Sequence, residues 1–552
     1  MTPGQLAETV RAAAAAVLAE RRVDLSALPA TVTVQRPRNP DHGDYASTVA
    51  LQVAPRAGLP AHELAQAVAA RLASDPAIRS VAVAGPGFLN IRLRSAAVGA
   101  IAGLVVEQGE GYGHGPALSG QRVNLEFVSS NPTGAVHLGG VRWAAVGDAL
   151  ARLLRAQGAD VTTEYYFNDA GAQIDRFTAS LLAAARHERP PEDGYLGEYV
   201  DEIAATVVRD HPDVFGTSDA EARETFRSEG IALMLGEIKA SLADFGVHFD
   251  VYFSENELHD AGALAAVLDE LRASGHVYEA DGATWVRTSD YGDDKDRVFI
   301  RSNGEFTYFA ADCAYYRNKR NRGFGKILVI LGADHHGYVG RMRAIAACLG
   351  DDPDQTLEIL IGQMVNLVRD GQPVRMSKRA GTITTIDDIV GAIGTDAARF
   401  ALARYSLDSA IDIDLDLWTR RSNDNPVYYV QYAHARIASL DRKAAKAGLH
   451  RGESYAAGLL SHPRENDLLK TLADFPAVVA AAAELRQPHR VARYLEGLAG
   501  TYHRFHDACR ILPRDEAPLD EVGRARLWLA DATRIVLANG LELLGLSAPE
   551  RL

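Results

Sequence analysis

The sequence has 552 residues, which is too long for one hydrophobic core and predicts two to four domains. Apolar residues make up 47% of it and charged residues 24%, a composition that excludes a disordered or low-complexity protein. The net charge of −14 disfavours a protein that coats nucleic acid through charge alone. Three widely separated cysteines exclude a disulfide framework or a four-cysteine zinc site, so we expect no protein-bound metal. No apolar run is long enough for a membrane span, and no secretory signal is recognisable, so we expect a cytoplasmic protein without a membrane partner.

The first part of the chain, about residues 1–110, predicts a small α+β domain. Apolar residues recur at helical spacing over residues 5–21, and β-branched residues alternate over residues 31–35 and 81–93. The glycine-rich stretch 109–120 is the expected boundary of this domain.

The next part, about residues 111–394, predicts an α/β domain with a Rossmann-like, doubly wound parallel sheet. A strand, a turn rich in glycine, a helix over residues 137–158 and a second strand is how such a sheet begins. Residues 175–290 are charged and read as a helical insertion between the two halves of the sheet. The expected strands are residues 123–128, 161–167 and 326–331.

The last part, residues 395–552, predicts an all-helical domain. No strand signal follows Gly394, and several segments carry apolar residues at helical spacing. The expected helices are residues 396–405, 426–447, 466–485, 489–509 and 521–544.

The turn after the first strand of the sheet is the first candidate site. It carries Gly134, His137, Gly139 and Gly140 where a strand meets a helix, and backbone N–H groups and the helix dipole favour phosphate there. The glycines would let a nucleotide approach the backbone, and His137 could donate a hydrogen bond to a phosphate oxygen. An ordinary glycine-rich turn with a capping histidine explains the segment equally well.

A basic loop much later in the chain is the second candidate site. It contains Arg375, Met376, Ser377, Lys378 and Arg379. Three cations and a hydroxyl on one loop can hold a triphosphate while its charge shifts during attack on the α-phosphorus. Taken alone, a solvated basic loop is the plainer interpretation.

A third set of residues could line one crevice at the strand ends. Tyr308 and Asp312 are four residues apart and therefore share a face of a helix. A buried carboxylate needs a cation, and a guanidinium offers it a planar, bidentate partner. An internal ion pair between Asp312 and an arginine of the protein is the alternative. The other members of the set are Glu126, Asn131 and His335.

The first two motifs together resemble those of the class I aminoacyl-tRNA synthetases. The segment His137-Leu138-Gly139-Gly140 is similar to their HIGH tetrapeptide, and Met376-Ser377-Lys378 matches the core of their KMSKS loop. The final histidine of the first motif is replaced by Gly140, and the first lysine of the second by Arg375. Over essentially its whole length the sequence resembles the arginyl-tRNA synthetase family, in the form of its actinobacterial branch.

The resemblance implies an arginine--tRNA ligase that forms arginyl-adenylate from L-arginine and ATP, with Mg²⁺ as part of the ATP complex. The arginyl group would then pass to the terminal adenosine of tRNA(Arg), and the protein would be a monomer. His137 and Lys378 would be catalytic; Glu126, Asn131 and His335 would contact the substrate; Tyr308 and Asp312 would read the guanidinium. The implied ATP-binding residues are Gly134, His137, Gly139, Gly140, Met376, Ser377 and Lys378.

Two further regions resemble the tRNA-contacting parts of the family. Phe88 and Asn90 fall where its amino-terminal domain contacts the tRNA elbow. Tyr432 and Arg436 fall on the helix that follows the opening segment, residues 396–400, of its anticodon-binding domain. Aromatic side chains can stack on unpaired anticodon bases, although ordinary core packing is the alternative for both regions. A basic cluster over residues 315–326 is interpreted as facing the acceptor stem, with a solvated face nearly as consistent.

Two other functions are compatible with parts of the pattern. A nucleotidyltransferase also uses a His-x-Gly turn, but it lacks a large helical RNA-binding domain. A catalytically inactive relative that binds RNA or senses arginine would explain Gly140. The intact His137, Gly139 and Lys378 count against that second alternative.

Overall fold

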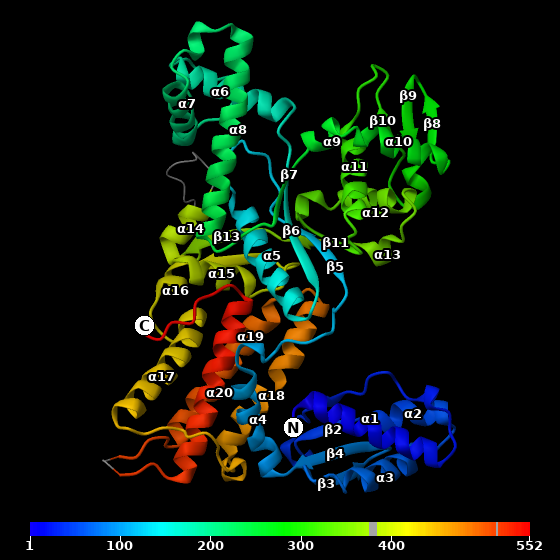
Figure 1. The fold of residues 1–552 in the computed structure, drawn as a ribbon, viewed down its shortest axis with the longest axis vertical. Helices are drawn as coiled ribbons and strands as arrows, with labels where there is room; N and C mark the ends of the chain where they lie inside the picture. Colours follow the sequence, from blue (N-terminus) through cyan, green and yellow to red (C-terminus); the bar gives the residue numbers. More distant parts are fainter. Residues whose placement is uncertain (375–383, 515–516) are drawn as a thin grey trace.

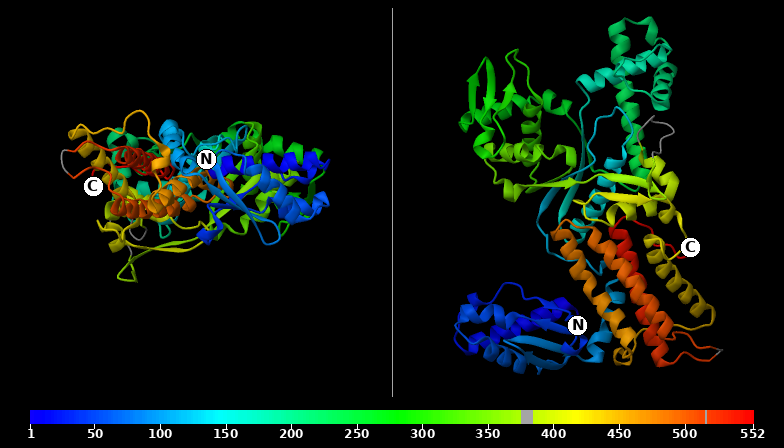
Figure 2. Two further views of the ribbon diagram at one scale, coloured as in Figure 1. Left: turned by 90° about the horizontal axis from the view of Figure 1, so that it is seen from below. Right: turned by 180° about the vertical axis from the view of Figure 1, so that it is seen from behind.

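The structure is a computed structural model that describes residues 1–374, 384–514 and 517–552. The molecule is elongated, with a sheet near its middle (Figure 1). Two lobes project from one side of this sheet, and the carboxyl-terminal helices and the amino-terminal domain lie on the other side. The view from behind shows the same arrangement (Figure 2).

The amino-terminal domain is an antiparallel sheet in the order β1-β2-β4-β3, with three helices packed against it. In β4, Leu89, Ile91 and Leu93 are buried and alternate with Phe88 and Asn90. Because side chains of a strand alternate between its two faces, one face of β4 joins the core and the other points away from it. The predicted α+β fold is confirmed. Its elements are α1 (Pro3–Glu20), β1 (Val34–Gln35), β2 (Tyr45–Ser47), α2 (Val49–Ala57), α3 (Ala61–Leu72), β3 (Ile78–Ala84) and β4 (Phe88–Leu93).

The central sheet has the order β12-β11-β5-β6-β7, and all its neighbouring strands are parallel. The strand order reverses between β5 and β11, which creates the switch point where doubly wound sheets bind ligands. The predicted doubly wound sheet and its three expected strands are confirmed. The elements are β5 (Arg122–Glu126), α5 (Leu138–Ala156), β6 (Asp160–Phe167), β7 (Val251–Ser254), β11 (Lys326–Gly332) and β12 (Leu357–Gly362).

The expected helical insertion over residues 175–290 is wrong in its second half. Helices α6 to α8 form one lobe, but the chain then adds β7 to the central sheet and builds an antiparallel sheet, β10-β9-β8, in the other lobe. The hairpin between β8 and β9 turns at Asp281-Gly282, both with positive φ, and such a pair is a strong hairpin signal that the charged composition obscured. The elements are α6 (Ala172–Ala185), α7 (Glu198–Asp210), α8 (Asp219–Asp244), α9 (Asn256–Asp260), α10 (Ala263–Ala273), β8 (Val277–Ala280), β9 (Ala283–Val286), β10 (Arg297–Ile300), α11 (Tyr308–Asn321), α12 (Tyr338–Cys348) and α13 (Pro353–Thr356).

The expectation that no strand follows Gly394 is also wrong. Strand β15 pairs in parallel with β13, in a small sheet of order β14-β13-β15. Its buried Ile411 and Ile413 alternate with Asp412 and Asp414, and four residues are too few for periodicity to identify. The elements are β13 (Val365–Arg369), β14 (Gln372–Pro373), α14 (Ile386–Ile393), α15 (Thr395–Ala403), β15 (Ile411–Asp414) and α16 (Leu415–Thr419).

The carboxyl-terminal domain is a bundle of helices, as predicted. Arg399 on α15 is fully buried; it donates to the carbonyls of Phe245 and Leu544 and pairs with Asp148 on α5, which ties the bundle to the central sheet. Among the helices of the described residues, none has both the length and the apolar character that a bilayer crossing requires. The bundle helices are α17 (Pro426–Lys446), α18 (Pro463–Glu484), α19 (His489–Ala508) and α20 (Glu521–Leu543), with α4 (Ser95–Gln108) packed on α18 and α20.

Candidate active site

The turn between β5 and α5 has the geometry of a nucleotide-binding turn. His137 is the N-cap of α5, and its Nδ1 accepts a hydrogen bond from the backbone N–H of Gly140 at 3.4 Å. Its ring lies directly over Gly139, where an added Cβ would be 3.0 Å from His137 Cε1. Gly139 therefore makes room for the histidine at the positive end of the helix dipole.

Gly140 is required by its neighbour Val136. A Cβ added at Gly140 would lie 2.6 Å from Val136 Cγ1, closer than Cβ atoms approach other heavy atoms. The side chain of Val136 is buried and fills the space that a larger residue at position 140 would need. Position 140, where the related tetrapeptide has its second histidine, is thus a glycine for a packing reason. No other polar group takes the place of that histidine at this position.

His137 also contacts the segment that follows the basic loop. Its backbone forms an isolated antiparallel bridge with Thr385, which caps α14. The pKa of His137 is lowered by desolvation from surrounding protein atoms, and the nearby Asp334 carboxylate opposes that shift. The basic loop itself lies outside the described residues, including Arg375, Met376, Ser377, Lys378 and Arg379. On the other side of the turn, Gly134 lies beside the Tyr199 hydroxyl.

Helix α11 carries a stripe of polar side chains toward the sheet. Tyr308, Asp312, Tyr315, Lys319 and Arg322 recur at intervals of three and four residues, so they follow one face of the helix and its C-cap. Asp312, Tyr315 and Lys319 line a cavity of about 50 Å³, enough for a group of a few heavy atoms. The other lining residues are Glu126, Tyr316, Ile327, Tyr338, Met342 and Ile345.

Asp312 is the titratable group of this cavity that lacks a cationic partner. The Tyr338 hydroxyl donates to its carboxylate at 2.8 Å, and within the described parts of the chain no cation lies within ion-pair distance of it. Burial raises the pKa of Asp312 to about 6, while the Tyr338 hydrogen bond and the charge of Arg341 oppose the shift. The alternative of an internal ion pair with an arginine is therefore not what the described residues show.

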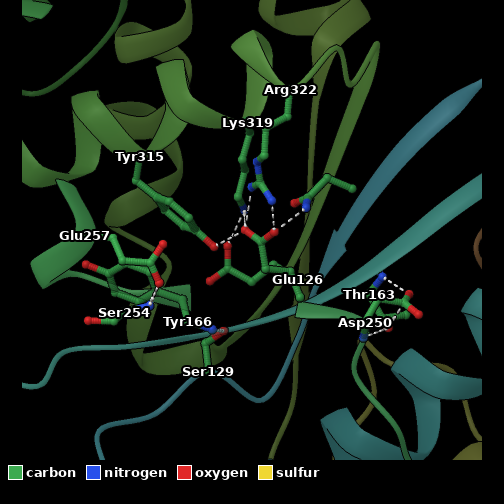
Figure 3. Close-up of polar contacts among 12 residues, drawn as sticks. Glu126, Ser129, Thr163, Tyr166, Asp250, Ser254, Glu257, Tyr315, Lys319 and Arg322 are labelled. Atoms are coloured by element: carbon green, nitrogen blue, oxygen red, sulfur yellow. Dashed lines mark hydrogen bonds and ion pairs between the residues drawn. The ribbon is translucent and has the colours of Figure 1, made fainter. Parts of the chain in front are cut away.

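Glu126 and Glu164 form a buried ion network at the inner end of the stripe. The two glutamates face each other on β5 and β6. Lys319 Nζ lies 2.5 Å from Glu126 Oε2 and 3.9 Å from Glu164, and Arg322 donates to both oxygens of Glu164 at 2.6 and 2.9 Å. Figure 3 shows Lys319 reaching from α11 toward Glu126, with Arg322 beside it.

This network contradicts the interpretation of residues 315–326 as a free basic surface. Each cation of the cluster has a carboxylate partner, so its charge is already matched within the protein. Sequence spacing could not reveal these pairs, because the partners come from other strands and helices. The pairs are Arg317–Glu270, Lys319–Glu126, Arg320–Asp351, Arg322–Glu164 and Lys326–Glu358.

Asn131 and Tyr308 lie beside a second, larger hollow. Asn131 donates to the side chain of Gln173 and accepts from the backbone of Asn168. Asn168 lines a hollow of about 230 Å³ together with Tyr308, whose side chain is 60% exposed, and the buried Glu255. Asp312 and Tyr308 share α11, but they line two neighbouring cavities.

Glu255 is a buried residue that the sequence analysis missed. It accepts a hydrogen bond from the Tyr166 hydroxyl, and burial raises the pKa of Glu255 above its usual value. It follows β7, and the failure to predict that strand concealed its place in the site.

His335 follows β11 at the same end of the sheet. Its side chain is exposed, with Nε2 3.4 Å from Asp334, and its ring meets Tyr338 edge-on at 6.2 Å. His335 thus lies next to the tyrosine that holds Asp312. Among the described residues, no three His, Cys, Asp or Glu side chains are grouped so that they could hold a metal ion.

The residues predicted to contact tRNA are on β4 and α17, two elements that lie away from this site in the lower half of Figure 1. Phe88, 40% exposed, and Asn90 share the outward face of β4. Tyr432 and Arg436 on α17 surround His503 of α19, with a ring separation of 5.8 Å for Tyr432. Burial and the charge of Arg436 lower the pKa of His503 to about 4, so this cluster keeps a neutral imidazole.

Three family models match the chain. They are described as "Arginyl tRNA synthetase N terminal domain" over residues 4–93, "tRNA synthetases class I (R), catalytic domain" over residues 220–404, and "DALR anticodon binding domain" over residues 430–552.

Curated and solved relatives agree with these matches. A protein of Kineococcus radiotolerans named Arginine--tRNA ligase is 58% identical over 554 residues, covering all of both chains. A Campylobacter jejuni structure assigned to the arginyl-tRNA synthetases is 32% identical with a TM-score of 0.76, covering 83% of this chain and 100% of that one. The Thermus thermophilus arginyl-tRNA synthetase has a TM-score of 0.74 over 100% of both chains; at 24% identity it shows the same fold.

Proposed function

The chain belongs to the arginyl-tRNA synthetase family, and from that premise we propose how its side chains carry out the reaction. It is an arginine--tRNA ligase: L-arginine and ATP give arginyl-adenylate and pyrophosphate, and the arginyl group is transferred to the 3′-terminal adenosine of tRNA(Arg). Our assignment of the site rests on Asp312, a largely buried carboxylate that has no cationic partner among the described residues.

The activation step needs positioning more than acid–base chemistry. The substrate carboxylate is already a nucleophile, so the protein has to align it with the α-phosphorus and stabilise the charge that develops there. We propose that His137 and Lys378 do so, with Mg²⁺ entering as part of the ATP complex. The N-cap position of His137 and its bridge to Thr385, close behind the basic loop, support this assignment.

The smaller cavity along α11 suits the charged side chain of the amino acid substrate. We propose that the guanidinium enters the smaller cavity and pairs with Asp312, since a planar fork matches a carboxylate there. Glu126, which lines the same cavity, contacts the substrate together with Asn131 and His335. Tyr308 closes the site from its exposed position, and the larger hollow beside it accepts the terminal adenosine of the tRNA.

ATP binding is assigned to the turn and the basic loop. The backbone at Gly134, Gly139 and Gly140 admits the nucleotide, and Lys378 with its neighbours Met376 and Ser377 contacts the phosphates. The N-cap position of His137, at the start of α5 where backbone N–H groups favour phosphate, supports this assignment.

The remaining parts of the chain are assigned to the tRNA. We propose that residues 1–110 contact the elbow through Phe88 and Asn90, that residues 111–394 are catalytic, and that residues 395–552 bind the anticodon through Tyr432 and Arg436. The outward face of β4 and the partly exposed aromatic cluster on α17 support these roles. We further propose that the protein acts as a monomer in the cytoplasm.

Arginine-dependent ATP–pyrophosphate exchange tests the proposal. The purified protein is assayed with and without total tRNA, and with lysine, glutamate and cysteine as control substrates. Exchange with arginine alone, and only when tRNA is present, is the expected result. Exchange with another amino acid would overturn the assignment of the pocket, and no exchange at all would indicate an inactive relative.

A further inference from the structure

Lys319 is a lysine buried at the inner end of the α11 stripe. Its side chain is 3% exposed, and its ammonium lies 2.5 Å from Glu126 and 4.2 Å from the centre of the Tyr315 ring. Figure 3 shows it pointing from α11 to Glu126, beside Tyr315. The lysine therefore reaches Glu126, the carboxylate that we assign to substrate binding.

Glu126 depends on this lysine for its position. Its neighbour Glu164 is held by Arg322 through both oxygens, by the Tyr315 hydroxyl at 2.5 Å and by Asn124 at 3.0 Å. Glu126 has a hydrogen bond from Lys319 to Oε2, and in the described parts of the chain Oε1 accepts none. One Glu126 oxygen is thus fixed and the other is left open toward the cavity.

The two glutamates would repel each other without the lysine. They are opposite residues on adjacent strands, and both side chains are largely buried, where like charges interact strongly. Burial alone would raise the pKa of Glu164, yet it lies below its usual value because Lys319, Arg322 and Tyr315 stabilise the carboxylate. Removing Lys319 would leave one buried negative charge without its cation.

We propose that Lys319 is a positioning residue for arginine binding: it fixes one oxygen of Glu126 and offsets its charge, so that the other oxygen accepts a hydrogen bond from the substrate in the cavity that Glu126 shares with Asp312. This inference rests on the proposed assignment of Glu126 to the substrate. Lys319 itself does not touch the substrate, and its effect passes through Glu126.

Titratable and charged groups from several elements face the Lys319–Glu126 pair. Loss of the Lys319 charge would therefore change the protonation of several of them together. Asp312, Tyr315 and Arg322 face it from α11 and its C-cap, and Glu164 and Tyr166 from β6. Beyond these, Glu255 follows β7, and Tyr338 and Arg341 face it from α12. With Lys319 gone, a carboxylate of this group would hold a proton at a pH where all are ionised in the parent protein.

The test compares Lys319→Met, Lys319→Arg and the control Arg317→Met in arginine-dependent exchange from pH 5.5 to 8.5. For Lys319→Met we expect the KM for arginine to rise about 10- to 100-fold and kcat to change less than about threefold. The reason is that the contact between Glu126 and the substrate is present in both the ground state and the transition state, and both are weakened alike. The acidic limb of kcat/KM should move to higher pH. Lys319→Arg should recover the parental pH profile.

Arg317→Met separates a structural effect from a positioning effect. Arg317 forms a comparable ion pair on the same helix, with Glu270, but it does not line the cavity. Its KM and pH profile should match those of the parent protein. A rise in the KM for arginine in Arg317→Met as large as that in Lys319→Met would contradict the inference.

The outcomes distinguish this inference from the proposed function. A parent protein that does not use arginine overturns the proposed function. An active parent with an unchanged or lower KM in Lys319→Met, and superimposable pH profiles, overturns the role of Lys319. If Lys319→Met does not fold, the variant Lys319→Met/Glu164→Gln, which loses one positive and one negative charge, should fold and keep the raised KM for arginine. A parental KM in this double variant would also overturn the role of Lys319.

Discussion

Asp312 shows at the scale of one residue how binding and stability oppose each other. Its carboxylate is largely buried next to Tyr338 and Arg341 but has no ion-pair partner among the described residues, so its charged form is costly until a cation arrives. A guanidinium that enters the cavity supplies that cation. The residue is therefore suited to its ligand and unfavourable for the empty protein.

The first prediction concerns the pH dependence of arginine use. Because the pKa of Asp312 is raised to about 6, its carboxylate becomes protonated as the pH falls through about 6, and the charge that attracts the guanidinium is lost. In exchange assays, kcat/KM for arginine should fall with decreasing pH below this value. A profile that stays flat down to pH 5 would contradict the assignment of Asp312.

The second prediction concerns stability. A carboxyl group whose pKa is raised on folding stabilises the protein below its unfolded value of 3.8, and that contribution is lost as the pH rises through about 6. Asp312→Asn should thus stabilise the protein at pH 7.5, by at most about 3 kcal/mol, and much less at pH 4.5. Thermal unfolding at the two pH values checks this; an equal change at both would rule out the explanation.

The site residues differ in how well the sequence predicts them. The spacing of Tyr308 and Asp312 places both on one helix, as the structure has them. The partner of Lys319 could not be predicted, because Glu126 lies 193 residues away and only the packing of α11 on the sheet brings them together. Basic residues that look like a surface cluster in sequence are matched one by one in three dimensions.

The turn from β5 to α5 combines a functional requirement with a packing requirement at the scale of an element. His137 needs the space above Gly139, and Val136 occupies the space above Gly140. The family pattern of two histidines is therefore incompatible with this turn unless Val136 changes too.

The third prediction follows from that packing. Gly140→His should destabilise the protein by about 1–3 kcal/mol, because the new Cβ would overlap Val136 Cγ1. The double variant Val136→Ala/Gly140→His should recover much of that loss. Thermal unfolding measures both proteins, and full stability of the single variant would show that the turn has room after all.

The fourth prediction concerns the basic loop. Lys378→Ala should lower the rate of arginine activation by about 10²- to 10³-fold while arginine binding changes little, since the lysine is assigned to charge that develops in the transition state. Single-turnover activation and arginine titration provide the two readouts. Full activity would remove Lys378 from the mechanism.

The sequence predicted long elements better than short ones. Long helices such as α5 and α17 and the buried strands β6 and β11 were predicted within a few residues, because their periodicity is sustained. The short strands β8, β9 and β15 were missed; acidic residues alternate through β15, and its pairing with β13 supplies what its sequence lacks.

The whole molecule separates the chemical site from the surfaces assigned to tRNA. The amino-terminal domain is fastened to α18 by two ion pairs, Arg36–Asp474 at 2.9 Å and Lys470–Asp44 at 2.5 Å. These contacts hold the outward face of β4 in a fixed relation to the bundle. The order of the domains was predictable from the sequence, but their relative placement was not, because it depends on pairs between residues hundreds of positions apart.

The fifth prediction uses that separation. Phe88→Ala should raise the KM for tRNA about tenfold through loss of a stacking platform, and leave the KM for arginine unchanged. Leu25→Ala, which removes another exposed apolar side chain of the same domain, is the control and should have little effect. Aminoacylation kinetics decide; a parental KM for tRNA in Phe88→Ala would contradict the elbow assignment.

In the proposed site, Asp312 selects the charge of the substrate side chain. The most direct measurement compares arginine with citrulline, a neutral analogue of nearly the same shape, in tRNA-dependent pyrophosphate exchange by the parent protein and Asp312→Asn. The parent should prefer arginine by at least about 100-fold, and the variant should lose most of that preference through weaker use of arginine. An undiminished preference in Asp312→Asn would contradict the claim.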